Sequence, residues 1–177
     1  MMVQARIVLP AAVIGLAALL LTAQPVCAID VPQTRAEFVR AVAAGARGVK
    51  METLVVERSL DDVYRTLEAR TSPCLDVEVR RTANVGYVET SSSDYNPTLK
   101  RLAPERAEFT LQVVHRPRGV GHTPPPGGLY IMAADLKRAS VSRTEVVLYR
   151  PTIGFKDITK SFLQWAEGSG TDCPKLR

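Results

Sequence analysis

The chain has few of the residues from which metal and redox centres are built. Of its 177 residues only two are histidine and three are cysteine. Six residues separate His115 from His122, and no other His, Cys, Asp or Glu lies between Glu108 and Asp135. A zinc-type ion needs three or four such ligands at close spacing. The sequence therefore predicts no metal site here, and it contains no Cys-x-x-Cys motif for a redox centre.

Signatures of covalent catalysis are also missing. No Gly-x-Ser-x-Gly sequence frames a serine, which excludes the nucleophile elbow of the hydrolases. Asp61 and Asp62 are adjacent carboxylates, but adjacent residues of a helix point apart. Both belong to the first turn of an expected helix, where acidic residues complement the helix dipole. We therefore expect neither an enzyme nor a cofactor.

Positive charge is present but never concentrated. The formal net charge is +5, yet no basic run is longer than the two residues Arg80-Arg81. Acidic residues stand beside the basic ones, as Asp157 does beside Lys156. A nucleic-acid-binding domain would show a basic stripe with exposed aromatic residues among the cations. The sequence predicts a mixed, solvated surface and no nucleic-acid partner.

The one long apolar run stands at the N-terminus. Arg6 precedes it, and Ile7 to Thr22 makes about 16 residues, fewer than the ~18 expected of a membrane span. Val26 and Ala28 then place small residues at the −3 and −1 positions of a cleavage site. This layout predicts a signal peptide over residues 1–28, cleaved after Ala28, and a periplasmic or secreted mature protein.

A lipoprotein signal is an alternative interpretation of the same segment, because such a signal also ends just before a cysteine. Cys27 would then carry the lipid. The residues before it, Gln24-Pro25-Val26, differ from the usual pattern of Leu, a small residue and Gly or Ala. Membrane association is expected only if Cys27 is lipidated, and an uncleaved anchor is the remaining alternative.

Cleavage after Ala28 leaves two cysteines, Cys74 and Cys173. An even count in an oxidising compartment favours a disulfide, and two free thiols are the alternative. The bridge would close a loop of about 100 residues, for which chain-entropy estimates give roughly 4–5 kcal/mol. We predict that it ties the C-terminal tail to the middle of the chain.

Residues 29–177 are expected to form a single α+β domain, because helical spacing gives way to period-two alternation along the chain. The capping signals at Thr34 and Ser59 each begin a helix, and Ser72-Pro73 is expected to end the second one. Thr90 to Pro97 is expected to be a polar turn or loop. The expected helices are 35–46, 60–72 and 155–167, and the expected strands are 50–57, 75–80, 85–89, 109–113, 129–133 and 141–149.

The order of strand, helix, antiparallel strands and final helix resembles the START-like or helix-grip fold over residues 50–167. The segments that resemble it are Met51 to Leu67, Thr144 to Tyr149 and Phe155 to Glu167. The resemblance implies an antiparallel curved sheet packed against a long C-terminal helix, with a hydrophobic ligand held between them. The extra N-terminal helix and Cys173 depart from this family, and are more similar to small exported bacterial proteins or lipoproteins of unknown function.

If a ligand site exists, we expect it between the final helix and the sheet. Trp165 and Tyr130 would line its apolar wall. The loop from Arg116 to Gly128 contains three consecutive prolines flanked by glycines, and we place it near the mouth of the site. Arg116 and Arg118 would meet a polar headgroup. A hairpin connection without a function, and a filled core around Trp165, are the alternatives.

These features favour an exported, non-enzymatic binding module, whose ligand is hydrophobic or lipid-like. The alternative is an envelope protein with a structural or protein-interaction role. The expected partner is accordingly an apolar small molecule or another envelope protein. An enzyme would have to assemble its catalytic groups from distant segments of the chain.

Overall fold

The computed structural model describes residues 31–84, 88–117 and 123–176. The compact unit that contains them begins at Val31. No helix of the described residues is long and apolar enough to cross a membrane. Several expectations fall outside the described residues: the signal peptide over 1–28 with Cys27, much of the strand expected at 85–89, Arg118 and His122.

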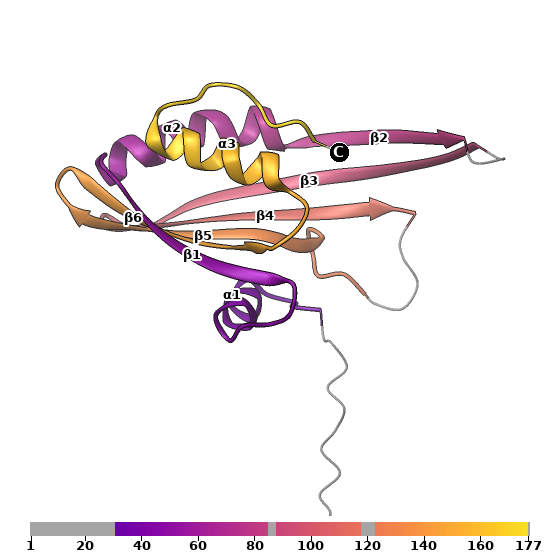
Figure 1. The fold of residues 1–177 in the computed structure, drawn as a ribbon, viewed down its shortest axis with the longest axis horizontal. Helices are drawn as coiled ribbons and strands as arrows, with labels where there is room; N and C mark the ends of the chain where they lie inside the picture. Colours follow the sequence, from indigo (N-terminus) through magenta and orange to yellow (C-terminus); the bar gives the residue numbers. More distant parts are fainter. Residues whose placement is uncertain (1–30, 85–87, 118–122, 177) are drawn as a thin grey trace, which may run out of the picture. The chain divides into compact units, whose positions relative to one another are not determined.

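The described residues form three helices and six strands, and the strands make one antiparallel sheet (Figure 1). The sheet order is β1-β6-β5-β4-β3-β2. Helices α2 and α3 contact each other on one face, and α1 lies on the opposite face. The elements are α1 Arg35–Ala43, β1 Val49–Val56, α2 Leu60–Leu75, β2 Val77–Asn84, β3 Val88–Ala103, β4 Arg106–Arg116, β5 Leu129–Ser140, β6 Arg143–Pro151 and α3 Lys156–Glu167.

The expected α+β class and antiparallel sheet are confirmed, and the final helix lies within one residue of its expected bounds, but it is not the long helix that the resemblance implied. Helix α3 has 12 residues. Gly154 and Phe155 precede it with φ of 72° and 48°, and Gly168 follows it with φ of 73°. These left-handed residues interrupt the helical conformation at both ends. The result is a short helix that shares its face of the sheet with α2.

Both expected N-caps are confirmed. The Thr34 hydroxyl accepts a hydrogen bond from the Glu37 backbone N–H at 3.2 Å, and the Ser59 hydroxyl accepts one from Asp62 at 3.2 Å. Each side chain satisfies one of the N–H groups that the first turn of a helix leaves unpaired. Helix α1 ends at Ala43, earlier than expected.

The expectation that Ser72-Pro73 ends the second helix is wrong. Helix α2 continues through Pro73 to Leu75, so Leu75 is not part of a strand. Proline inside a helix costs about 3 kcal/mol. Burial of Leu75 at 0% exposure returns about 2 kcal/mol, and the disulfide at Cys74 further favours this geometry. Tertiary contacts therefore outweigh the local preference against a helix.

The polar segment from Thr90 to Pro97 is also not a loop, because it belongs to β3, a strand of 16 residues. Its serines pair on both sides: Ser92 lies opposite Arg80 of β2 and Arg116 of β4. Pro97 lies beyond the last residue of β3 that pairs with β2, where the missing N–H is tolerated. The segment therefore forms a strand because it pairs with β2 and β4, although its own sequence favours a turn.

The sheet is covered on both faces, with a large hydrophobic core under α2 and α3 and a small one under α1. Strand β6 shows the expected alternation: Val146 and Leu148 face the large core, Val147 and Tyr149 the small one. In β5 a bulge at Ile131 shifts the register. Within the strand expected at 129–133, Leu129 and Ile131 therefore face the large core and Ala133 faces the small one.

Helix α3 buries one stripe of apolar side chains. Ile158, Phe162 and Ala166 are buried, and the ring centroids of Phe162 and Phe109 are 4.8 Å apart. The end of the helix is satisfied by a residue that the sequence did not single out. Arg58 Nη1 donates to the Ala166 carbonyl at 2.9 Å, and Nη2 donates to Thr66 Oγ1 at 3.0 Å. Arg58 therefore joins the C-terminus of α3 to α2.

Candidate functional site

The predicted disulfide between Cys74 and Cys173 is present, and the two Cα atoms are 5.1 Å apart. Cys74 is buried in the last turn of α2. Cys173 belongs to the tail that follows α3, which contains neither helix nor strand. Trp165 Nε1 also donates a hydrogen bond to the Asp172 carbonyl at 3.3 Å. The disulfide is compatible with an oxidising, non-cytoplasmic compartment.

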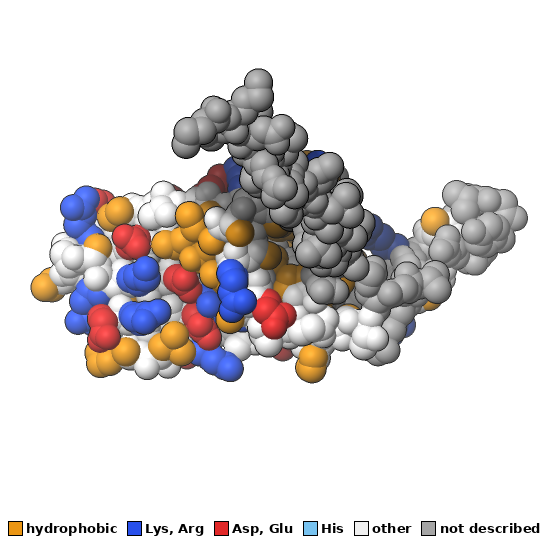
Figure 2. Space-filling model, turned by 90° about the horizontal axis from the view of Figure 1, so that it is seen from below, with side chains coloured by type: hydrophobic (Ala, Val, Ile, Leu, Met, Phe, Trp, Pro, Cys, Tyr) orange, Lys and Arg blue, Asp and Glu red, His pale blue; other side chains and the backbone are white. Residues whose placement is uncertain are grey.

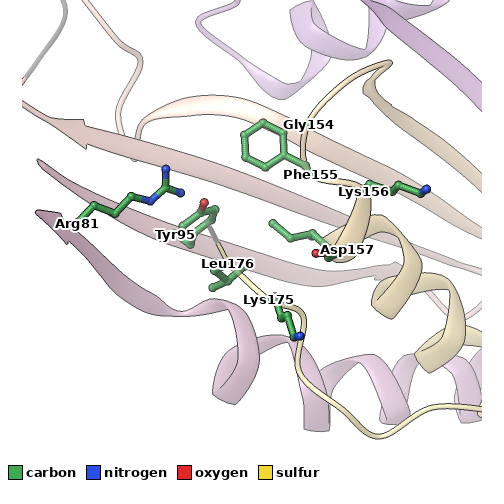
Figure 3. A pocket seen from close by; sticks show the side chains of 9 residues that line it. Arg81, Tyr95, Gly154, Phe155, Lys156, Asp157, Lys175 and Leu176 are labelled. Carbon is green, nitrogen blue, oxygen red and sulfur yellow. The ribbon is translucent and has the colours of Figure 1, made fainter. Parts of the chain in front are cut away.

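A cavity of about 500 Å³ opens where α3 begins (Figure 3). Strands β2 and β3, the turn before α3, its first residues and the C-terminal tail all contribute to it. This volume falls within the range of small-molecule sites. The lining residues are Arg81, Tyr95, Gly154, Phe155, Lys156, Asp157, Ile158, Lys175 and Leu176.

The backbone at the edge of this cavity is unusual. Phe155 is the one described non-glycine residue with positive φ, and it follows Gly154, which is also left-handed. No side chain caps the N-terminus of α3. The two residues turn the chain from β6 back over the sheet and leave the Phe155 ring partly buried against the large core. A strained conformation of this kind often accompanies a functional site.

The floor of the cavity is apolar. Tyr95 and Ile158 are each 2% exposed, and Phe155 and Leu176 pack partly buried against the same core. Burial raises the pKa of the Tyr95 phenol, and the positive charge of Arg81 partly opposes this rise. The phenol therefore stays neutral, and almost none of the Tyr95 side chain is exposed.

The rim of the cavity is positively charged. Its lining contains three cationic side chains, Arg81, Lys156 and Lys175, and one carboxylate, Asp157. Among the described residues none of these four forms an ion pair. In Figure 3 the Arg81 side chain points toward Tyr95, whereas both lysines extend away from the centre. Arg81 is thus the cation directed into the cavity, and the lysines add positive potential at its mouth.

The side chains predicted to line a ligand site do not come together. Trp165 is fully buried in the large core. Tyr130 lies on the opposite face of the sheet, stacked on Phe38 with 5.9 Å between ring centroids. Arg116 pairs with Asp94 at 2.7 Å. None of these residues lines the cavity at α3, and Arg118 is outside the described residues.

The proline-rich loop is also placed differently from the expectation. Its described residues 123–128 lie against side chains of the α1 face rather than at the cavity. Gln112 Nε2 donates to the Gly128 carbonyl at 2.7 Å, and Asn96 Nδ2 donates to the Gly127 carbonyl at 3.0 Å. Gly128 has φ of 102° and approaches the Val113 carbonyl so closely that a Cβ would overlap it.

Sequence reasoning missed the residues that do line the cavity, although two signals were present. Arg81 continues the alternation of Val77 and Val79, which places a cation on the face of β2 that turns toward the core. Lys175 and Leu176 follow Cys173, so the predicted disulfide already implied that the tail returns to the fold. Tyr95 had no such signal, because it lies in the segment expected to be a loop.

A second polar cluster lies under α1. Arg35 forms ion pairs from Nη2 to Asp135 Oδ1 at 2.6 Å and from Nη1 to Glu108 Oε2 at 3.2 Å. The Tyr149 hydroxyl donates a hydrogen bond to Asp135 Oδ2 at 3.1 Å. Burial raises the pKa of Tyr149, and the charge of Asp135 raises it further. A cavity of about 130 Å³ adjoins the cluster. These contacts attach the first residue of α1 to the sheet, which is a structural role.

The histidine that can be placed lies on β4. His115 Nδ1 is 2.9 Å from Ser93 Oγ on the neighbouring strand. Within the described residues no three His, Cys, Asp or Glu side chains gather where they could hold a metal ion. His115 therefore serves as a cross-strand hydrogen-bonding partner in this structure.

The face that carries α1 shows no charge of a single sign. In Figure 2, Lys and Arg side chains are interspersed with Asp and Glu, and hydrophobic side chains gather between them.

No family model matches the chain, and no curated protein matches its sequence significantly. The cavity at the start of α3 is therefore the feature on which a functional assignment depends.

Proposed function

We propose that this protein is an exported, non-enzymatic binding module, and that its ligand is an amphiphile with an apolar chain and an anionic group. The cavity of about 500 Å³ at the start of α3 carries the proposal, because it joins an apolar floor to a cationic rim. Its position between the sheet and the final helix is also where the sequence led us to expect a ligand.

The apolar half of the ligand would lie on Phe155 and Leu176, the two partly buried apolar side chains of the lining. Phe155 comes from the turn before α3 and Leu176 from the tail, while Tyr95 and Ile158 complete the lining as almost fully buried side chains. Each methylene transferred from water onto such a surface gains about 0.8 kcal/mol. A chain of several methylenes would therefore supply most of the affinity.

The anionic group would lie beside Arg81. This guanidinium has no ion-pair partner among the described residues, and the neighbouring phenol is neutral. Guanidinium groups bind carboxylates and phosphates through two parallel hydrogen bonds. Lys156 and Lys175 at the rim outnumber Asp157 and favour the approach of an anion.

A helix-grip architecture is part of this proposal. Two observations support it: Phe162 of α3 packs on Phe109 of β4 in the large core on one face of an antiparallel sheet, and β1 lies beside β6, the last strand. The short α3 and the added α1 are departures from that architecture. Export through a signal peptide over residues 1–28 also belongs to the proposal, with lipidation at Cys27 as the alternative, and the disulfide is compatible with either.

Titration calorimetry with laurate and with dodecanol tests the proposal, since the two molecules share an apolar chain and differ in charge. We expect laurate to bind, and we expect Arg81→Gln to weaken it about tenfold or more through the lost charge-assisted bonds. Arg80→Gln is the matched control, because Arg80 faces the other side of β2 and pairs with Glu78 at 2.9 Å. Absence of binding by both molecules would refute the proposed function.

A protein-interaction role is the second candidate, and one observation favours it. Strand β1 is an edge of the sheet, and its Met51 and Val55 are 50% and 49% exposed. An exposed apolar edge strand is a site at which another chain can add a strand. A stoichiometric protein copurifying with the wild type, and lost in Met51→Lys with Val55→Lys, would favour this role over ligand binding.

A further inference from the structure

The C-terminal tail forms one wall of the cavity, although it belongs to no helix or strand. Lys175 and Leu176 line the cavity just after Cys173, which is bonded to Cys74. Figure 3 shows the Leu176 side chain beside Tyr95, whereas Lys175 extends away from the centre of the cavity. The disulfide at Cys173 therefore anchors the chain two residues before Lys175, the first tail residue that lines the cavity.

Among the described residues, few hydrogen bonds hold the tail in place. Before Cys173, hydrogen bonds from Ser169 and Trp165 hold the tail. The Ser169 N–H donates to the Gln164 carbonyl at 2.9 Å, and Trp165 Nε1 donates to the Asp172 carbonyl at 3.3 Å. Within the described chain no hydrogen bond involves Lys175 or Leu176. Leu176 packs only partly buried against the large core. Segments with so few contacts open at low free-energy cost.

We propose that the tail is a redox-dependent wall of the cavity, so that the protein retains its ligand while the Cys74–Cys173 bond is closed and releases it when the bond is reduced. This inference rests on the proposed function, and it adds a mode of regulation to that site. Reduction frees the tail from α2, and the cavity loses Lys175 and the apolar contact of Leu176.

The exposure of the two cysteines indicates how reduction proceeds. Cys173 is exposed and Cys74 is 5% exposed, so a dithiol reductant reaches the bond from the side of Cys173. Its thiolate attacks the Cys173 sulfur, and the Cys74 thiolate leaves and takes up a proton. The second thiol of the reductant then displaces Cys173 as a thiol. Two electrons have reduced the protein disulfide, and the reductant has become a disulfide.

Laurate binding is measured on three forms of the purified protein: oxidised, reduced with excess dithiothreitol, and a truncated form that ends at Pro174. The truncated form keeps the disulfide but lacks Lys175, Leu176 and the terminal Arg177, so it tests the wall without reducing any bond. We expect the reduced and truncated forms to bind about tenfold or more weakly than the oxidised form. Circular dichroism checks that every form is folded at the temperature of the titration.

Hydrogen exchange provides a readout that does not depend on the ligand. We expect the amides of residues 170–176 to exchange faster in the reduced protein, while those of Phe162 and Trp165 in α3 change little. Equal affinity of the oxidised and reduced forms, or an equally protected tail, would overturn the redox-dependent wall while leaving the proposed function intact. If the oxidised form itself binds no laurate, the proposed function fails instead.

Discussion

Arg80 and Arg81 are neighbours in sequence, but β2 turns them to opposite faces of the sheet. Arg80 is paired with Glu78, and Arg81 is unpaired in the described residues and borders the cavity. Composition counts both simply as positive charge. The difference between a solvated surface residue and a candidate ligand contact arises only from their places in the strand alternation.

Phe162 is a residue at which truncation should strongly destabilise the fold. It is fully buried and packs on Phe109 at the centre of the contact between α3 and the sheet. Phe162→Ala should lower the free energy of unfolding by about 3–5 kcal/mol, because it removes the apolar contact and leaves a cavity. Lys160→Ala, on the exposed side of α3, should change it by less than about 0.5 kcal/mol. Equal effects in urea denaturation would show that α3 is not part of the core.

Glu52 should make stability depend on pH. Burial acts to raise its pKa, but hydrogen bonds and charges of Lys50 and of Arg150, at 2.8 Å, outweigh burial and hold the pKa below its usual value. A carboxyl with a lowered pKa stabilises the folded state above its unfolded pKa and loses this contribution as pH falls through the folded pKa. Glu52→Gln should therefore destabilise the protein near neutral pH and progressively less below about pH 4.5.

Chemical denaturation of both proteins at several pH values measures this difference. Glu68→Gln is the control, because Glu68 is exposed and forms no ion pair within the described residues. We expect that variant to match the wild type throughout. A constant difference between Glu52→Gln and the wild type from neutral to acidic pH would contradict the assignment.

At the scale of elements, periodicity and capping predicted most segments, and they failed where long-range contacts decided. The N-caps at Thr34 and Ser59 were read correctly because capping is local. The end of α2, the β3 strand through Ser92 and the bulge at Ile131 were missed. Each of these depends on a disulfide, on neighbouring strands or on a register that sequence alternation does not contain.

Two glycines with positive φ, Gly48 and Gly168, allow the cost of backbone strain to be separated from the cost of a steric conflict. Gly48 and Gly168 have φ of 80° and 73°, but a Cβ at Gly48 would contact nothing within 4 Å. At Gly168 it would meet Arg58 Nη1 at 2.9 Å. Gly48→Ala should therefore cost about 1–2 kcal/mol from backbone strain alone. Gly168→Ala should cost about 1 kcal/mol more, because Arg58 is displaced from the carbonyls of α3.

Thermal unfolding of the two variants provides the comparison. Arg58→Ala with Gly168→Ala should cost less than the sum of the two single changes, since Arg58 is then absent and cannot be displaced. Additive effects would show that Arg58 does not cap the helix as described.

At the scale of the whole molecule, the sequence predicted the class of fold and the disulfide, but not the site. Sheet, helices and the pairing of Cys74 with Cys173 follow from patterns along the chain. The cavity requires Arg81 and Tyr95, from the consecutive strands β2 and β3, to meet Leu176 from the C-terminal tail, which is far from both in sequence. Large aromatic residues such as Trp165 were natural candidates, but one fully buried in the core has no surface left for a ligand.

Ligand binding should stabilise the whole domain, because a molecule that binds only the folded state shifts the unfolding equilibrium. At a laurate concentration of about 100 times its dissociation constant the gain is about 2.7 kcal/mol. For a domain of this size each kcal/mol raises the melting temperature by roughly 2–4 °C, so calorimetry should show a rise of about 5–10 °C. Arg81→Gln, studied at the same laurate concentration, should show a clearly smaller rise, and Arg80→Gln should match the wild type. An equal rise in all three proteins would mean that laurate binds elsewhere than at the cavity beside Arg81.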